Sequence, residues 1–138
     1  MASVTLKSTL TLEGAKLVAG AAVAEAQRRA IAVTIAVADI GGHLLYLERM
    51  DGAPAASPDN ATAKARTCAL FGGIATNDLD EMTARRPGML NLPGIVPVQG
   101  GLPLRFSDQL VGAIGVSGAD PVDDDRVAER GVDALTHS

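Results

Sequence analysis

The residue types with chemical potential gather in one stretch, DIGGHLLYLERMDGA, which runs from Asp39 to Ala53. It contains His43, one of two histidines in the chain, together with Arg49 and Asp51. The ordinary pKa of histidine lies near neutrality, so His43 is a candidate for moving a proton or binding a metal ion. The competing interpretation is a polar residue that opens a strand after a tight turn and faces water.

A second constellation combines Arg49 and Asp51 with Lys64, which follows in a predicted helix. An Arg and a Lys that converge beside an apolar helix face would suit a carboxylate ligand. Asp51, kept ionised by neighbouring positive charge, would then be a candidate base. The alternative is that Arg49 and Asp51 form an ion pair that orders the turn, while Lys64 is solvated. At helical spacing, the residues that share a face with Lys64 are Asn60, Cys68 and Phe71.

The glycine patterns do not predict a nucleotide site. Gly112, Gly115 and Gly118 are spaced by three and lack the first close pair of the dinucleotide fingerprint. The acidic residues in 120–125 would also repel phosphate from the start of the following helix. The pair Gly100–Gly101 instead predicts a place where the backbone closely approaches a ligand or another subunit.

Metal and nucleophile signals are sparse. With two histidines, one cysteine and no CxxC or HxxxH spacing, a closed zinc site would need carboxylates. The absence of CxxCH excludes covalently attached haem. Cys68 lies in an apolar helix stripe and is interpreted as a small core residue. Ser117 has no histidine near it in sequence, and His137 stands next to the chain end.

Composition bounds the class of protein. The chain has 138 residues, 47% of them hydrophobic but only 2% aromatic, so its core must be built from small aliphatic side chains. Such a core leaves little internal room for a large cofactor, which favours a surface cleft or a subunit interface. Net charge is -4 and the basic residues are scattered, so nucleic acid is not an expected partner.

The sequence also bears on location and assembly. No apolar run approaches the roughly 20 residues of a membrane helix, and the first residues do not resemble a signal peptide. With a lone cysteine, a cytoplasmic location and no membrane partner are expected. Mean hydropathy is +0.20, which favours burial of apolar surface in a homo-oligomer.

Hydrophobic periodicity and capping residues predict the elements. The buried run AIAVTIAVADI is expected to form a central strand, joined to HLLYLERM by a two-residue hairpin turn at Gly41–Gly42. The other predicted elements are helices from Thr11 to about 29, from Ser57 to about 71, at 77–86 and from Asp120 to about 135, with strands at 95–98, 102–106 and 110–116. This order predicts an α+β fold with mostly antiparallel strands, a single domain over residues 1–138.

Several motifs, taken together, carry a family resemblance. TLTLEGAK is followed by VADIGGHLLYLERMDGA, then by Ser57 and Lys64, and later by QGGLPL and LVGAIGVSGADPVDD. In this order the motifs resemble the GlcG/HbpS family, which includes the C-terminal domain of PduO-type proteins, over roughly residues 9–135. Between residues 76 and 97 the chain departs from the family's common glycine-rich stretch, beside the expected ligand cleft.

The resemblance implies a profilin-like fold, with a five-stranded antiparallel sheet in the order 2-1-5-4-3 and helices on both faces. It also implies symmetric oligomers. Some family members bind haem non-covalently, and others are linked to corrinoid metabolism.

The leading hypothesis is therefore a cytoplasmic, oligomeric protein that binds haem or a related tetrapyrrole non-covalently. Arg49 and Lys64 would anchor carboxylates, His43 would be the axial ligand of the iron, and Phe71, Gly100 and Gly101 would line the site. One alternative is a cofactor-independent enzyme acting by proton transfer, as a lyase or an isomerase, on a small organic acid or an aromatic-catabolism intermediate. In that case Asp51 or His43 would transfer a proton. A second alternative is a ligand-free scaffold or regulatory subunit.

Overall fold

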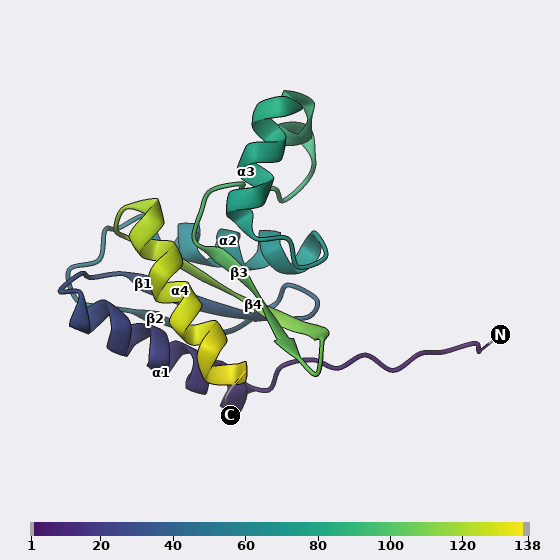
Figure 1. Ribbon diagram of the computed structural model, residues 1–138, viewed down its shortest axis with the longest axis horizontal. Helices are drawn as coiled ribbons and strands as arrows, with labels where there is room; N and C mark the ends of the chain where they lie inside the picture. Colours follow the sequence, from purple (N-terminus) through teal and green to yellow (C-terminus); the bar gives the residue numbers. More distant parts are fainter. Residues whose placement is uncertain (1, 137–138) are drawn as a thin grey trace.

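The computed structural model describes residues 2–136, which form one sheet with helices on both faces (Figure 1). His137 lies outside the described residues. In chain order the elements are α1 (Leu12–Arg28), β1 (Thr34–Asp39), β2 (Leu44–Arg49), α2 (Ser57–Leu70), α3 (Thr76–Arg85), the 3-10 helix η1 (Pro87–Asn91), β3 (Gly101–Phe106), β4 (Gln109–Ser117) and α4 (Pro121–Thr136).

Within residues 2–136 the sheet has four strands, all antiparallel, in the order β2-β1-β4-β3. The expected five-stranded order was wrong in one respect, because residues 95–98 are not a strand. Their backbone bonds go elsewhere: Val96 N–H donates to Thr67 Oγ1 at 3.0 Å, and Val98 N–H donates to the carbonyl of Val96 in a tight turn. The segment is therefore tied to α2, and β3 is left as an edge strand.

The central strand β1 is buried on both faces, as its continuous apolar run predicts. Ile35 and Val37 belong to the cluster beneath α1 and α4, whereas Ala36 and Ala38 belong to the cluster beneath α2. Figure 1 shows the same division, with α1 and α4 side by side on one face of the sheet and α2 on the other.

The β1–β2 hairpin differs from the predicted two-residue turn. Asp39 N–H donates to the carbonyl of His43, so three residues form the loop, and Gly42 takes a φ of +80° while Gly41 does not take a positive φ. An irregularity in the register then pairs Leu44 with Ala38. Both side chains lie on the face of the sheet that α2 covers. The sequence alternation after this bulge places Leu47 and Arg49 on that face too.

Helix α2 approaches strand β4 unusually closely. A Cβ atom added at Gly115 would collide with the backbone carbonyl of Ala61 and would lie 2.6 Å from the backbone nitrogen of Ala65. Only glycine at this position lets the helix backbone rest on the strand. The small residues therefore bring the α2 backbone close to the sheet, with few side-chain atoms between them.

Helix α3 and η1 stand away from the sheet as a projecting arm (Figure 1). The arm is attached at its base, where Gly101 N–H donates to Thr76 Oγ1 at 2.8 Å and Leu79 is buried. Among the described residues, no helix is both long and apolar enough to cross a membrane.

Replacement of Gly115 by alanine should destabilise the protein by about 3 kcal/mol, because the added methyl group forces α2 away from β4. Gly20→Ala is the matched control: Gly20 is an exposed position within α1 with no atom within 4 Å of the added Cβ. That change should stabilise the protein by about 0.5–1 kcal/mol through helix propensity. Urea denaturation measures both, and equal effects would contradict the close packing of α2 on β4.

Candidate functional site

Lys64 is a buried charge at the centre of the structure. Its side chain leaves α2 and is only 3% exposed, so the alternative interpretation of a solvated Lys64 is wrong. The ammonium Nζ donates to the backbone carbonyl of Val116 at 2.8 Å and to Asp124 Oδ2 at 3.3 Å. Lys64 thereby links α2 to the end of β4 and to the first turns of α4.

The pair Gly100–Gly101 makes room for this lysine. Gly100 has a φ of +127°, and a Cβ there would lie 2.9 Å from Lys64 Nζ and 2.6 Å from the carbonyl oxygen of Val116. A Cβ on Gly101 would lie 2.7 Å from the backbone oxygen of Lys64. The structure thus brings three of the predicted ligand-binding residues together, and the glycines approach α2 itself.

Asp124 is the partner that the sequence interpretation overlooked. Its Oδ1 accepts from the backbone N–H of Ala119, just before α4, at 2.9 Å. The same carboxylate therefore binds this backbone group and pairs with Lys64. Asp125 Oδ2 accepts from Gln99 Nε2 at 3.1 Å, while its Oδ1 is buried without a hydrogen-bond partner in the described part of the chain.

Burial shifts both members of the Lys64–Asp124 pair toward neutrality. Desolvation lowers the pKa of Lys64, although the charges of Asp124 and Asp125 oppose the shift. Desolvation raises the pKa of Asp124, against the hydrogen bond from Ala119 and the charge of Lys64. The free energy of proton transfer from the ammonium to the carboxylate is therefore smaller than in water.

A cleft of about 240 Å³ opens beside this pair. We call it the Lys64 cleft; it is lined by Asn60, Lys64, Val96, Val98, Ser117, Ala119, Pro121 and Asp124. Its walls are apolar on the side of the 96–98 segment and polar on the side of α2 and β4. Such a cleft can hold a small molecule with one polar end.

A second hollow, of about 540 Å³, lies between β2 and α2. We call it the β2–α2 groove; it is lined by Leu44, Leu47, Pro58, Asp59, Thr62, Ala63, Arg66, Gly94 and Val96. Arg66 Nη1 donates to the carbonyl of Gly42 at 2.9 Å, which holds the guanidinium at the end of the groove next to the hairpin turn. The groove is a largely apolar trough that carries two charged side chains, Arg66 at the hairpin end and Asp59.

The remaining predicted site residues do not converge. His43 is exposed before the first residue of β2, and Asp51 is exposed beyond its last, so about 20 Å of strand separates them. Arg49 donates to the carbonyl of Ala53 at 3.2 Å and forms no ion pair with Asp51 in the described part of the chain. Phe71 is half-buried at the end of α2.

Among residues 2–136, no group of three or more His, Cys, Asp or Glu side chains is placed to hold a metal ion. Cys68 is fully buried, and desolvation raises the pKa of its thiol to about 12. It is therefore a core residue, as predicted, and a poor nucleophile.

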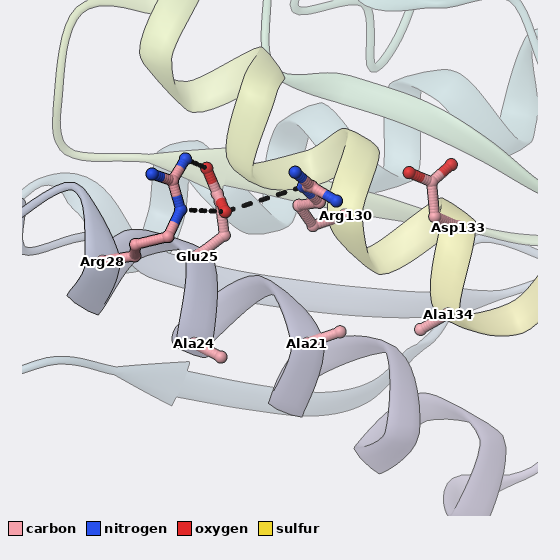
Figure 2. Close-up of a pocket in the computed structure, with 7 residues that line it drawn as sticks. All are labelled: Ala21, Ala24, Glu25, Arg28, Arg130, Asp133 and Ala134. Carbon is pink, nitrogen blue, oxygen red and sulfur yellow. Dashed lines mark hydrogen bonds and ion pairs between the residues drawn. The ribbon is translucent and has the colours of Figure 1, made fainter.

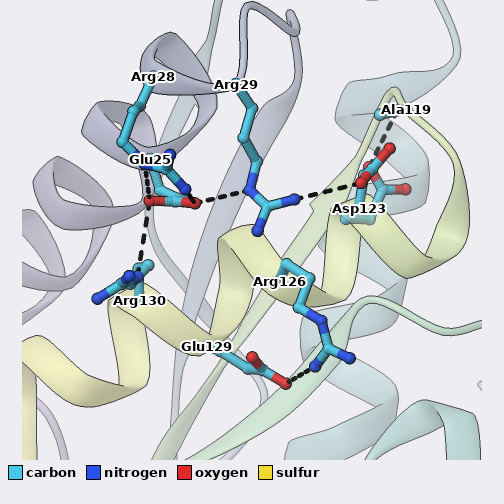
Figure 3. A network of polar contacts seen from close by, with 9 residues as sticks. Glu25, Arg28, Arg29, Ala119, Asp123, Arg126, Glu129 and Arg130 are labelled. Atoms are coloured by element: carbon cyan, nitrogen blue, oxygen red, sulfur yellow. Dashed lines mark hydrogen bonds and ion pairs between the residues drawn. The ribbon is translucent and has the colours of Figure 1, made fainter.

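A further hollow, of about 560 Å³, lies between α1 and α4, and ion pairs of Glu25 with Arg28 and Arg130 lie at its wall (Figure 2). Glu25 is buried at its wall, where its carboxylate accepts from Arg28 at 2.6 Å and Arg29 at 2.6 Å. Arg130 of α4 lies 3.6 Å away, and Arg29 continues to Asp123 at 3.3 Å (Figure 3). These contacts tie α1 to α4 and satisfy the carboxylate, so we assign the cluster a structural role.

Sequence reasoning missed two residues that the structure places at the hollows. Asp124 was grouped with the acidic start of α4, although it stands three and four residues before the buried Val127 and Ala128 and so lies on the inward face of the helix. Arg66 carried no signal, because an arginine on an exposed helix position usually indicates only a solvated face.

The fold defines a class of small α+β proteins in which helices cover both faces of an antiparallel sheet. Within that class the chain belongs to the HbpS-like family, since the family model described as "Haem degrading protein HbpS-like" matches residues 10–133. This confirms the resemblance to the GlcG/HbpS family.

Three relatives illustrate the relationship. Protein GlcG of Escherichia coli (strain K12) is 38% identical over 112 residues, which are 80% of this chain and 83% of that protein. A double mutant of HbpS from Streptomyces reticuli has a crystal structure that is similar with a TM-score of 0.90 at 34% identity, covering 98% of this chain and 92% of that one. The crystal structure of a PduOC:heme complex has a TM-score of 0.82 at 27% identity, covering 91% and 94% of the two chains.

Loss of Lys64 should be far more costly than loss of the whole ion pair. Lys64→Met leaves Asp124 buried without its cation and should destabilise the protein by about 3–5 kcal/mol. The double variant Lys64→Met/Asp124→Leu should recover most of that loss, because no uncompensated charge remains. Urea denaturation of the single and double variants gives the coupling, and additive effects would refute a direct Lys64–Asp124 interaction.

The Glu25 cluster should govern part of the acid sensitivity. Hydrogen bonds from Arg28 and Arg29 lower the pKa of Glu25 from 4.5 to about 2. The unfolded chain binds the proton first as pH falls, so the stability from this carboxylate is complete above pH 4.5 and lost between pH 4.5 and about 2. Glu25→Gln should reduce the slope of stability against pH in that window, measured by urea denaturation. Glu129→Gln, in an exposed pair with Arg126, is the control and should leave the slope unchanged.

Proposed function

We propose that the protein binds haem or a related tetrapyrrole non-covalently, as a homo-oligomer in the cytoplasm. The observation that carries this proposal is its 27% identity and TM-score of 0.82 to a domain crystallised as a PduOC:heme complex. Membership of a family whose model is described as haem-degrading supports the same ligand class.

The β2–α2 groove is the hollow that best suits a flat, apolar macrocycle. Its volume of about 540 Å³ exceeds twice that of the Lys64 cleft, and Leu44, Leu47, Pro58 and Val96 provide apolar walls. Leu44 remains 47% exposed in the single chain, so a ligand that covered it would gain hydrophobic burial.

The charged residues around the groove suggest how the ligand would be held. Arg66, already fixed to the carbonyl of Gly42, would pair with a carboxylate of the ligand. His43 adjoins Leu44 and is exposed, so it is available as an axial ligand for iron. Lys64 is less suited to the anchoring role first predicted for it, because it is buried and paired with Asp124. Arg49 lies farther along the same face of β2.

The open shape of the groove favours an oligomer. A tetrapyrrole in a trough on one subunit would keep an exposed face, and a second copy of the chain would cover it. The single free cysteine is in keeping with a reducing compartment, which supports the cytoplasmic assignment.

The geometry gives less support to the proton-transfer enzyme built on His43 and Asp51. The two side chains lie at opposite ends of β2, so they would not act on one small substrate within the same subunit.

Titration of the purified protein with hemin should give saturable binding with a Soret shift. His43→Ala should abolish the shift of a ligated iron, whereas His137→Ala, at the other histidine of the chain, should leave it unchanged. Leu44→Glu should weaken hemin binding at least about tenfold, because it puts a carboxylate into an apolar wall.

Leu17→Glu is the matched control for the groove variant, since Leu17 is 46% exposed on α1 and lies outside the groove. It should bind hemin like the unaltered protein. Absence of saturable binding in the unaltered protein would reject the proposed function, and equal binding by both leucine variants would move the ligand away from the groove.

A further inference from the structure

The side chain of Lys64 is buried and yet borders a cleft, so its amine is a candidate reactive group. Two of the three N–H donors of its ammonium are used, by the carbonyl of Val116 and by Asp124. No third protein partner for Nζ is found among residues 2–136. The remaining position of the nitrogen is thus available to a molecule in the Lys64 cleft.

The charges around this lysine argue against an anionic ligand. Asp124 and Asp125 both act on Lys64, so the single ammonium is outnumbered by carboxylates. Asp125 also has a buried oxygen that receives no hydrogen bond from residues 2–136. An incoming carboxylate or phosphate would meet net negative surroundings, whereas a neutral carbonyl compound would not.

The same environment favours the uncharged forms of amine and acid. Burial lowers the pKa of Lys64 and raises that of Asp124, and the two side chains are 3.3 Å apart. Transfer of one proton would convert the buried ion pair into a neutral amine beside a neutral carboxylic acid. A nucleophilic amine with an adjacent acid is the equipment for condensation with a carbonyl group.

We propose that Lys64 forms an imine with a small neutral aldehyde or ketone bound in the Lys64 cleft. The Nζ lone pair attacks the carbonyl carbon, and the carbonyl oxygen takes a proton from Asp124 to give a carbinolamine. The nitrogen then gives one proton back to the carboxylate, Asp124 protonates the hydroxyl group, which leaves as water, and return of the last N–H proton to Asp124 completes the carbon–nitrogen double bond. One carbonyl compound is consumed and one water is released, so the step needs no oxidant or reductant.

The cleft sets the size and character of the substrate. Its volume of about 240 Å³ corresponds to about eight water molecules, which limits the compound to about eight non-hydrogen atoms. Asn60 and Ser117 lie on the polar side and suit the carbonyl oxygen or the carbinolamine hydroxyl. Val96, Val98 and Pro121 suit a short hydrocarbon tail. This site is separate from the β2–α2 groove and does not depend on haem binding.

The chain provides its own controls, because it has three lysines and only Lys64 is buried. The full-length protein would be incubated at neutral pH with acetone and sodium cyanoborohydride, which reduces an imine to a stable isopropyl-lysine. Peptide mass spectrometry then gives the rate of modification at each lysine. Lys64 should react at least about tenfold faster than Lys7 and Lys16, which are both exposed to water.

Two variants connect the reaction to the cleft. Ala119→Leu fills the cleft and should slow modification of Lys64 at least about tenfold while leaving Lys16 unchanged. Asp124→Asn removes the acid and should also slow Lys64, and circular dichroism would verify that each variant is folded. Modification of Lys64 no faster than that of Lys16 would overturn the proposal, as would an undiminished rate in folded Ala119→Leu.

Discussion

The contact between α2 and β4 is the constraint on which the rest of the structure depends. Gly115 has no side chain, so the helix backbone at Ala61 and Ala65 lies directly on the strand. A lysine on the inward side of a helix this close to the strand is withdrawn from bulk water and borders only the Lys64 cleft. Its stem crosses the end of β4, and its ammonium is left at the carbonyl of Val116. The burial of Lys64 is thus a consequence of the missing side chain at Gly115 on the strand beneath α2.

Once Lys64 is buried, its ammonium needs an opposite charge, hydrogen-bond acceptors and space, and the neighbouring residues provide them. Asp124 supplies the opposite charge, and the first turns of α4 must begin where that carboxylate can also receive the N–H of Ala119. Gly100 must lack a side chain because Lys64 Nζ occupies that space. A buried ion pair is weak evidence for stability, since a well-packed apolar pair often does as well. The Lys64–Asp124 pair therefore fits the chemical role proposed for Lys64 better than a purely structural role.

Much of the fold was accessible from the sequence, because its signals are local. The two-sided burial of β1 and the capping of α1 by Thr11 Oγ1 both depend on neighbouring residues. The strand expected at 95–98 failed for a tertiary reason: Thr67 of α2 takes up the backbone of that segment. The candidate site was less accessible, because nothing local distinguishes a buried lysine from a solvated one.

The segment around Val96 connects the two hollows of the α2 face. Val96 lines both the β2–α2 groove and the Lys64 cleft, and Thr67 Oγ1 fixes it by accepting from its N–H while donating to the carbonyl of Gly94. Helix α2 likewise presents Arg66 to one hollow and Lys64 to the other. The two hollows therefore share a wall that one hydroxyl group holds in place, although their linings suit different ligands.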